Sequence, residues 1–216
     1  MNQVDVSWSV GRATIGVVVR ALAPLRVYGS ERVPATGGVV LAMNHFSWLD
    51  PPAFGTACPR NLRYLAKIEL HRVKLIGPLI RSFGAFSVRR GESDREAVRL
   101  MRRCVQEGDA LGLFAEGTRQ RSGVPGEVLP GAAMVGLQEH VPIVPAAIHG
   151  SQFWKPGNFE PVSVAWGRPL TFEGLPANAK GYREASAEIE RAIHSLWRFL
   201  VDLHTLGRPR HAAPPA

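Results

Sequence analysis

The sequence predicts an α/β fold, a single domain in which a mixed, mostly parallel sheet is flanked by helices. Short apolar runs of strand length alternate along the chain with longer segments of helical periodicity. The length of 216 residues, 45% of them hydrophobic, is enough for one sizeable core and short of two ordinary domains. We find no internal repeat and no linker, and we assign the domain to residues 26–206.

Residues 1–25 are expected to form an amphipathic N-terminal helix. Its apolar positions include Trp8, and Arg12 and Arg20 flank them. Such a face can lie in a membrane interface or pack on a protein core, and both interpretations stay open. The apolar run is shorter than the roughly 20 residues of a membrane span, and the N-terminus is a poor signal peptide.

A short, apolar, β-branched run at residues 38–43 reads as a buried strand, and the turn after it carries a His and an Asp. His45 follows the strand, and Asp50 precedes two prolines that suit the first turn of a helix. On one helix these two residues would point about 140° apart, whereas a turn can bring them together. The junction between a strand end and a helix is where α/β proteins usually place their chemistry.

Two further strands are expected to end in basic residues. Residues 62–67 alternate as a strand does and end in Lys67. After an apolar and basic stretch, residues 85–88 form a short strand that runs into Arg89 and Arg90. These cations would therefore follow strand ends, as His45 does.

A central strand is expected at residues 110–114, because the run is continuously apolar. A capping-box sequence at residues 93–96 opens the helix before it, and Gly108 ends that helix. The strand leads into a polar turn made of Glu116, Gly117, Thr118 and Arg119.

The C-terminal part completes the alternation of helices and strands. We expect a small-residue helix at 131–139, a strand at 141–148, a strand at 162–166 and a helix at 182–206. Prolines at the entry and in the middle of the 141–148 strand indicate an irregular or edge position. The proline-rich tail at 207–216 is expected to be disordered.

The polar groups at these strand ends can converge, because the carboxyl ends of parallel strands share one edge of a sheet. A His beside a carboxylate is a general base, since the carboxylate fixes the tautomer and stabilises the imidazolium. No Gly-x-Ser-x-Gly elbow is present, and Cys58 and Cys104 lie outside any motif. This pattern indicates a substrate hydroxyl as nucleophile, although a surface ion pair at the Glu116 turn is the structural alternative.

The formal net charge of +8 suits an anionic partner, such as a phosphate, a membrane surface or nucleic acid, or it reflects genomic composition. Aromatic residues make up 8% of the chain and are not interleaved with the arginines, which disfavours nucleic acid. The seven His residues show no paired ligand spacing, so no metal is expected. A non-catalytic basic module remains as an alternative from another class.

Four ordered blocks resemble those of the glycerolipid acyltransferases, the lysophosphatidate acyltransferase (PlsC-like) family. The first is Asn44-His45-x4-Asp50, and the others lie at residues 84–91, 114–119 and 141–148. The resemblance covers roughly residues 26–170. Two positions depart from the family pattern: Ala115 replaces the usual Pro, and Leu129-Pro130 stands where many members carry a basic residue.

The resemblance implies transfer of a fatty acyl group from acyl-CoA or acyl carrier protein to the hydroxyl of lysophosphatidate, giving phosphatidate without a cofactor. It implies that His45 is the base and Asp50 its orienting partner. It also implies a cytoplasmic enzyme, peripheral on the inner face of the membrane. A different lysolipid or another lipid hydroxyl stays open as the acceptor, because Leu129-Pro130 stands where many members carry a basic residue. The residues expected to bind substrate are Asn44, Lys67, Arg89, Arg90, Glu116, Gly117, Thr118 and Arg119.

Overall fold

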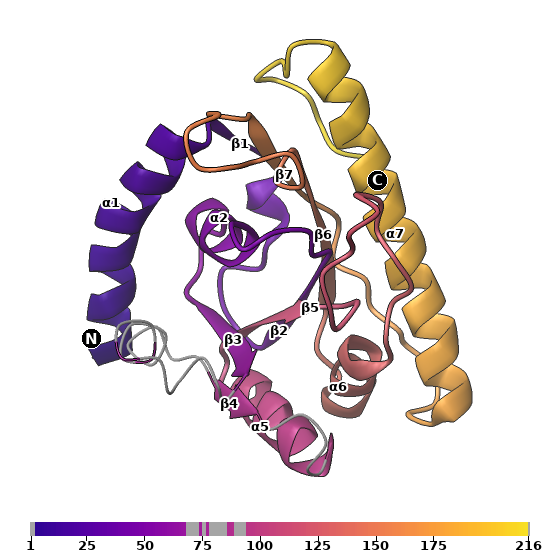
Figure 1. Cartoon of the computed structure of the whole chain (residues 1–216). Coiled ribbons are helices and arrows are strands. Elements are labelled where there is room, and N and C mark those ends of the chain that lie inside the picture. Colours follow the sequence, from indigo (N-terminus) through magenta and orange to yellow (C-terminus); the bar gives the residue numbers. More distant parts are fainter. Residues whose placement is uncertain (1–2, 68–73, 75–76, 78–85, 89–93, 216) are drawn as a thin grey trace.

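A computed structural model describes residues 3–67, 74, 77, 86–88 and 94–215, and its centre is a seven-stranded sheet (Figure 1). The strand order is β1-β7-β6-β2-β5-β3-β4. The strands are β1 (Leu25–Tyr28), β2 (Val39–Met43), β3 (Leu62–Lys67), β4 (Phe86–Val88), β5 (Ala110–Phe114), β6 (Ile143–His149) and β7 (Val162–Trp166).

The sheet is mixed and mostly parallel, as the sequence predicts. β2 pairs in parallel with both β5 and β6, and β3 pairs in parallel with β5 and β4. β7 runs antiparallel to β6, and β1 pairs in parallel with β7. The carboxyl ends of β2, β5 and β6 therefore meet at one edge, which we call the carboxyl edge.

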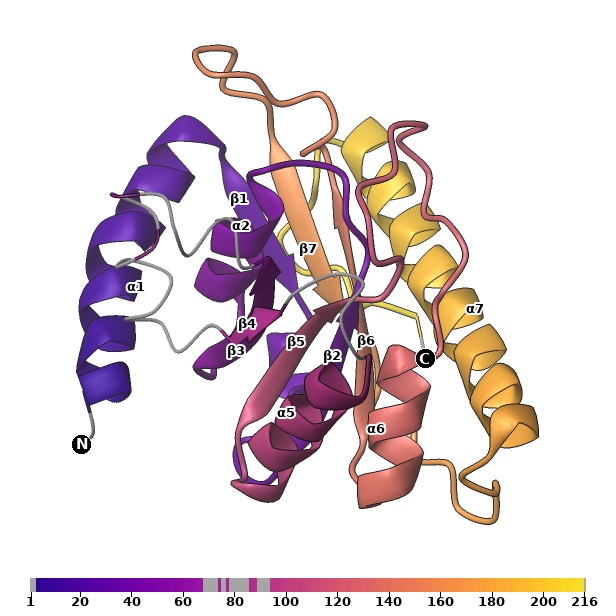
Figure 2. The ribbon, with the colours of Figure 1, turned by 60° about the horizontal axis from the view of Figure 1, so that its bottom comes forward.

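Helices cover both faces of the sheet (Figure 2). α1 and α2 lie on one face, and α5, α6 and α7 lie on the other. Successive residues of β2 point to opposite faces, so Leu41 joins the core under α2 while Val40 joins the core under α6 and α7. The helices are α1 (Gln3–Leu22), α2 (Asp50–Ala57), α5 (Asp94–Gln106), α6 (Gly131–Glu139) and α7 (Ala179–Thr205).

α1 packs along α2 with part of its apolar surface. Trp8 is buried, and a Cβ atom at Gly55 of α2 would come within 3.2 Å of the Trp8 ring, so a glycine permits this close approach. At the other end of α1, Val17, Val18 and Leu22 are exposed. Among the described helices, none has the length and apolar character that a membrane crossing needs.

Of the two alternatives for the 141–148 strand, an irregular or an edge position, the edge position is wrong, because β6 lies between β7 and β2. Pro145 is tolerated there for a local reason. The Pro145 carbonyl accepts from Gly167 N at 2.8 Å, so the Pro145 nitrogen also faces the segment that follows β7. The ladder with β7 has already ended there, at the pair Ala146–Trp166, and the sheet requires no N–H from residue 145.

Residues 207–215, for which the sequence predicts disorder, lie against the domain in this structure. The Arg32 guanidinium donates to Pro214 O and to Pro215 O, each at 2.7 Å. Pro214 is buried, and Ala212 packs on the core cluster that contains Tyr28 and α7 residues. Backbone carbonyls of the tail, which sequence patterns do not weigh, supply these contacts.

Candidate active site

The turn after β2 brings His45 and Asp50 together, as the sequence predicts. His45 Nδ1 lies 2.7 Å from Asp50 Oδ2. Asp50 is fully buried, whereas the His45 side chain is 17% exposed. Because a carboxylate only accepts hydrogen bonds, Nδ1 carries the proton, and the ring presents Nε2 on its other side.

Backbone donors of the same turn fix the Asp50 carboxylate. Phe46 N donates to Oδ2 at 2.6 Å, and Ser47 N donates to the same atom at 2.7 Å. Asp50 is also the first residue of α2, where the helix dipole favours a negative charge. Within the described residues Oδ1 has no hydrogen-bond partner, so Oδ2 makes all the contacts that orient His45.

Aromatic packing holds the imidazole ring from the side. Phe114, the last residue of β5, stacks on His45 with ring centroids 4.0 Å apart and planes 21° apart. Tyr64 stacks on Phe114 in turn, and its hydroxyl donates to Pro51 O at 3.1 Å. Phe114 was not among the site residues that the sequence predicts, although its position as the last residue of a central strand, directly before the Glu116 turn, was a signal for it.

Glu116 connects the His45 turn to the loop after β5. Its Oε2 accepts from His45 N at 2.9 Å, and its Oε1 accepts from Gly126 N at 2.9 Å. The residue is 5% exposed. Both carboxylate oxygens thus accept from backbone donors, which tie the His45 turn to the loop after β5, and the expected contact of Glu116 with substrate stays a prediction.

Burial raises the pKa of Glu116 to about 7, even though the backbone hydrogen bonds from Gly126 and His45 favour the charged form. The negative charge of Asp50 adds to this increase of the pKa. Near neutral pH the carboxyl group is therefore balanced between its two protonation states.

Asn44 does not face the site, in contrast to the expectation that it binds substrate. Its Nδ2 donates to Ile148 O at 3.2 Å, and its Oδ1 accepts from Ile148 N at 2.8 Å. Asn44 is fully buried. Its amide continues the β2–β6 ladder beyond the last backbone pair, which locks the two strand ends together.

The rest of the Glu116 turn lies at the surface. Gly117 has a φ of 67°, and a Cβ atom there would lie 2.6 Å from Leu129 Cδ1, so the turn requires glycine. Thr118 and Arg119 are exposed. The Arg119 guanidinium sits 4.3 Å from the ring centroid of Trp48, which is itself 67% exposed.

Of the four expected cations, only the Arg119 side chain lies within the described part of the chain. Arg119 is at the carboxyl edge, at the end of the Glu116 turn. Lys67 is the last residue of β3, and the structure describes its backbone but not its side chain. Arg89 and Arg90 lie outside the described residues.

Backbone donors of the His45 turn are already engaged. The amides of His45, Phe46 and Ser47 bond to carboxylates, and Ala53 N donates to Leu49 O at 2.9 Å. Together with the two prolines of α2, this excludes the start of that helix as a donor to a developing oxyanion. Among the described side chains, no group of three metal-ligating residues is present.

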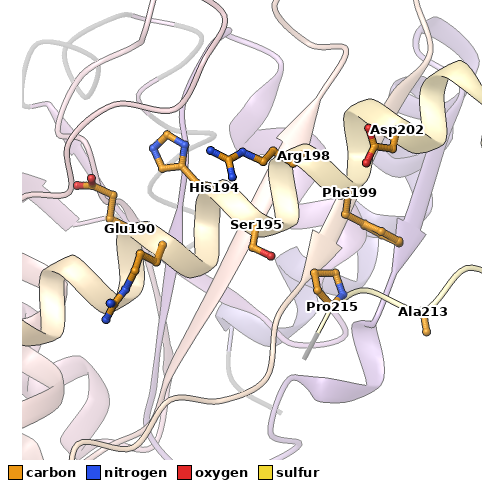
Figure 3. Close-up of a pocket in the computed structure, with 9 residues that line it drawn as sticks. Glu190, His194, Ser195, Arg198, Phe199, Asp202, Ala213 and Pro215 are labelled. Carbon is orange, nitrogen blue, oxygen red and sulfur yellow. The ribbon is translucent and has the colours of Figure 1, made fainter.

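An open groove of about 790 Å³ lies elsewhere, between α7 and the C-terminal tail (Figure 3). His194, Arg198 and Phe199 of α7 line it, together with Pro215 of the tail. None of its lining residues belongs to the His45 site. The groove therefore offers no chemistry that joins the base.

Three comparisons bear on the identity of the chain. Residues 24–149 match the Acyltransferase family. A 1-acyl-sn-glycerol-3-phosphate acyltransferase of Bacillus subtilis is 30% identical over 172 residues, which are 76% of this chain and 84% of that protein. A protein of the same name from Borreliella burgdorferi is 29% identical over 133 residues, 58% of this chain and 51% of that protein.

A solved structure shares the fold. The 1-acyl-sn-glycerophosphate (LPA) acyltransferase PlsC of Thermotoga maritima superimposes with a TM-score of 0.73 at 21% sequence identity. The similarity covers 91% of this chain and 79% of that chain. The fold of this chain is thus one that a solved acyltransferase also has.

Proposed function

The chain belongs to the Acyltransferase family, and on that premise we propose that it transfers a fatty acyl group to the free hydroxyl of lysophosphatidate, giving phosphatidate. The observation that carries the proposal is the 2.7 Å contact between His45 Nδ1 and the fully buried Asp50 Oδ2 at the carboxyl edge. The names of the Bacillus subtilis and Borreliella burgdorferi relatives support the choice of acceptor.

His45 is the general base in this proposal. Its Nε2 accepts the proton of the acceptor hydroxyl while the hydroxyl oxygen bonds to the thioester carbonyl carbon. The positive charge that forms on the ring is stabilised by Asp50, whose own position is fixed by Phe46 N and Ser47 N. Phe114 and the Glu116–His45 contact keep the ring in place during the transfer.

The second half of the reaction breaks the carbon–sulfur bond. The tetrahedral intermediate collapses to the ester, and the thiolate of the donor leaves and takes the proton from imidazolium Nε2. We propose acyl-CoA or acyl carrier protein as the donor, because either supplies such a thioester. No protein nucleophile is required, in keeping with the buried positions of Cys58 and Cys104.

The acceptor phosphate is proposed to contact the cations that follow the strand ends. Arg119 is exposed at the carboxyl edge, and a forked guanidinium suits a phosphate. Lys67, Arg89 and Arg90 remain proposed partners of the same phosphate. The protein is proposed to act as a peripheral protein on the cytoplasmic face of the membrane, where its lipid acceptor resides.

Thiol release from acyl-CoA in the presence and absence of lysophosphatidate tests the proposal. We expect acceptor-dependent release with the natural chain and a loss of at least about 100-fold in the His45→Ala variant. The matched control is His211→Ala, since His211 is exposed in the tail. Acceptor-dependent transfer that survives in His45→Ala would overturn the role of the base.

A different lysolipid acceptor is the second candidate, favoured by Leu129 and Pro130 where many family members carry a basic residue. A panel of lysophosphatidate, lysophosphatidylcholine and lysophosphatidylglycerol separates the two. Preference for lysophosphatidate supports the first candidate. Preference for a lysolipid with a larger headgroup moves the assignment to the second.

A further inference from the structure

The loop between β6 and β7, residues 150–161, leaves two large aromatic side chains in solvent. Phe153 is 57% exposed and Phe159 is 56% exposed. Figure 2 shows this loop, in orange, projecting beyond the sheet. Large apolar side chains that are exposed together mark an interaction site, whereas single exposed ones are ordinary.

Hydrogen bonds hold this loop in one conformation. Asn158 Oδ1 accepts from Lys155 N at 3.0 Å and from Glu160 N at 3.2 Å, and Asn158 Nδ2 donates to Phe153 O at 2.9 Å. Phe159 has a φ of 50°, a left-handed backbone that a bulky residue rarely adopts. The loop is built to keep the aromatic rings outside, and strain of this kind gathers at functional positions.

The loop adjoins the exposed end of α1. Trp154 Nε1 donates to Leu22 O at 3.1 Å, which ties the two segments together. Val17 is 63% exposed and Val18 is 53% exposed on that end of the helix. We call the combined surface the apolar rim, and its members are Val17, Val18, Leu22, Phe153 and Phe159.

Cations predominate around the apolar rim. Arg20 and Lys155 are exposed on its two segments, and Arg26 follows α1 in β1. The Arg208 guanidinium donates to Pro24 O at 2.7 Å, beside the same helix end. Glu160 is the acidic residue of the loop, and its charge faces that of Arg208. This balance complements an anionic surface.

The apolar rim lies at the same edge of the sheet as the candidate base. β6 and β2 are parallel neighbours, and the Asn44–Ile148 hydrogen bonds join their carboxyl ends. The loop leaves β6 at that end, and the His45 turn leaves β2 there. A surface that the rim contacts would therefore face the entrance to His45.

We propose that the apolar rim docks the protein on an anionic lipid bilayer, with Phe153 and Phe159 inserted among the headgroups. The choice of a lipid surface over a protein partner rests on the proposed function, because a lipid acceptor must be taken from a bilayer. Aromatic and aliphatic side chains beside cations are the chemistry that binds such an interface.

Vesicle sedimentation without any substrate tests the docking. The natural chain should sediment with vesicles of phosphatidylcholine and phosphatidylglycerol and less with phosphatidylcholine alone. Phe153→Ser/Phe159→Ser should weaken sedimentation at least about tenfold, given the apolar area removed. Equal sedimentation of the natural chain and the double variant would overturn the proposal, as would failure of the natural chain to bind vesicles.

A pair of lysine variants tests the electrostatic part. Lys155→Gln should weaken binding to anionic vesicles by about fivefold. Lys180→Gln is the matched control, because Lys180 is also exposed but lies at the start of α7, which follows the far end of β7. Equal effects of the two variants would show that the attraction depends on net charge alone, and would contradict a specific contribution of the loop.

A single labelled position keeps the proposal testable if the double variant misfolds. Cys58 and Cys104 are buried, so a nitroxide spin label on Phe153→Cys reports from the loop alone. The label should become accessible to oxygen in the bilayer when anionic vesicles are added. A label on Lys180→Cys should stay in water, and the same behaviour at position 153 would contradict insertion.

Failure of the docking and failure of the proposed function have different signatures. Activity on detergent-dispersed lysophosphatidate does not require a bilayer, so Phe153→Ser/Phe159→Ser should retain it while losing activity on vesicles. Absence of acyl transfer in both settings by the natural chain would overturn the function and leave the vesicle-binding result standing on its own.

Discussion

At the scale of single residues, one oxygen of the Asp50 carboxylate accepts from three donors. Two of them, Phe46 N and Ser47 N, fix that oxygen where it orients His45. Asp50→Asn can keep the hydrogen bonds from Phe46 N, Ser47 N and His45 Nδ1 but loses the charge that stabilises the imidazolium. We predict a decrease in kcat of about 100-fold or more with little change in KM. Steady-state kinetics measures both.

Asp109→Asn is the matched control for this charge loss. Asp109 precedes β5 at the opposite edge of the sheet, where it pairs with Arg63 at 3.0 Å. Its variant should keep a normal kcat. A rise in KM with an unchanged kcat in Asp50→Asn would instead place Asp50 in acceptor binding.

Glu116 gives a second prediction at the residue scale, because burial raises its pKa to about 7. A folded pKa above the unfolded value means that the native state holds the proton more tightly. Stability from this group is therefore full below about pH 4.5 and is lost as pH rises toward 7. The natural chain should lose roughly 1–3 kcal/mol relative to Glu116→Gln over that window.

Thermal unfolding of both proteins at several pH values measures this difference. Glu107→Gln is the control, since Glu107 is exposed and pairs with Arg103. A gap between the natural chain and Glu116→Gln that does not change with pH would show that the carboxyl group stays charged throughout.

At the scale of elements, Asn44 fastens the end of β2 to β6. Asn44→Ala leaves Ile148 N and Ile148 O without the side-chain partner in a buried setting. We predict a loss of roughly 2–4 kcal/mol in the free energy of unfolding, with an unchanged KM for the acceptor. Denaturant titration and kinetics measure the two quantities.

Thr118→Ala is the contrasting variant. Thr118 is exposed on the Glu116 turn, so its removal should leave stability unchanged. If Asn44→Ala raised the acceptor KM without lowering stability, the assignment of Asn44 as a fastening residue would fail.

A pair of histidines, of which His149 is buried and His204 is half-buried, joins α7 to the sheet. His149 and His204 have ring centroids 4.6 Å apart, and His204 Nε2 lies 3.0 Å from Ser163 Oγ. Burial lowers the pKa of each to about 4, and for His204 the neighbouring His149 and Arg208 add to this decrease of the pKa. Both rings are neutral at pH 7.

The sign of the pH effect follows from these lowered pKa values. The unfolded chain takes up protons near pH 6.5 and the native chain near 4, so stability is lost as pH falls through that interval. We predict that the free energy of unfolding of His204→Gln falls by roughly 1–2 kcal/mol less than that of the natural chain over this interval. The range allows for the partial exposure of His204. Unfolding measured from pH 7 to 4 against His211→Gln, in the exposed tail, provides the check; identical slopes would contradict it.

For the whole molecule, short-range patterns were enough to locate the helices and strands. The strands at 62–67, 110–114 and 162–166 have the predicted bounds, because a buried strand is a short apolar run between turn residues. The His45–Asp50 contact was also predictable, since both residues belong to one turn. The patterns indicated that strand ends share one edge of the sheet, but they could not supply which side chain bonds to which partner in a distant segment.

Such distant contacts hold two of the residues that the sequence analysis expected to bind substrate. Asn44 and Ile148 are 104 positions apart, and Glu116 reaches His45 from 71 positions away. A buried amide or carboxylate that pairs with backbone looks the same in a sequence as one that awaits a substrate. Likewise, β6 can be an interior strand despite Pro145 because the ladder with β7 ends at Ala146, and no local pattern indicates where that ladder ends.

The docked tail gives a final prediction at this scale. The two terminal nitrogens of the Arg32 guanidinium donate to Pro214 O and Pro215 O, so deletion of residues 209–216 removes the partners of a charged donor. We predict a loss of roughly 1–2 kcal/mol, which for a chain of this size lowers Tm by about 2–8 °C. The kcat should not change, since Arg32 also donates to Trp166 O at the end of β7 that lies away from His45.

A double-mutant cycle separates this contact from general shortening of the chain. Arg32→Gln in the full chain should lower Tm as the deletion does, and the two changes together should lower it little further, because they remove the same bonds. Fully additive effects would mean that the tail stabilises the domain through Pro214 and Ala212 packing alone. The non-additive result would make the C-terminal segment a structural part of the sheet's outer edge, held by its backbone carbonyls.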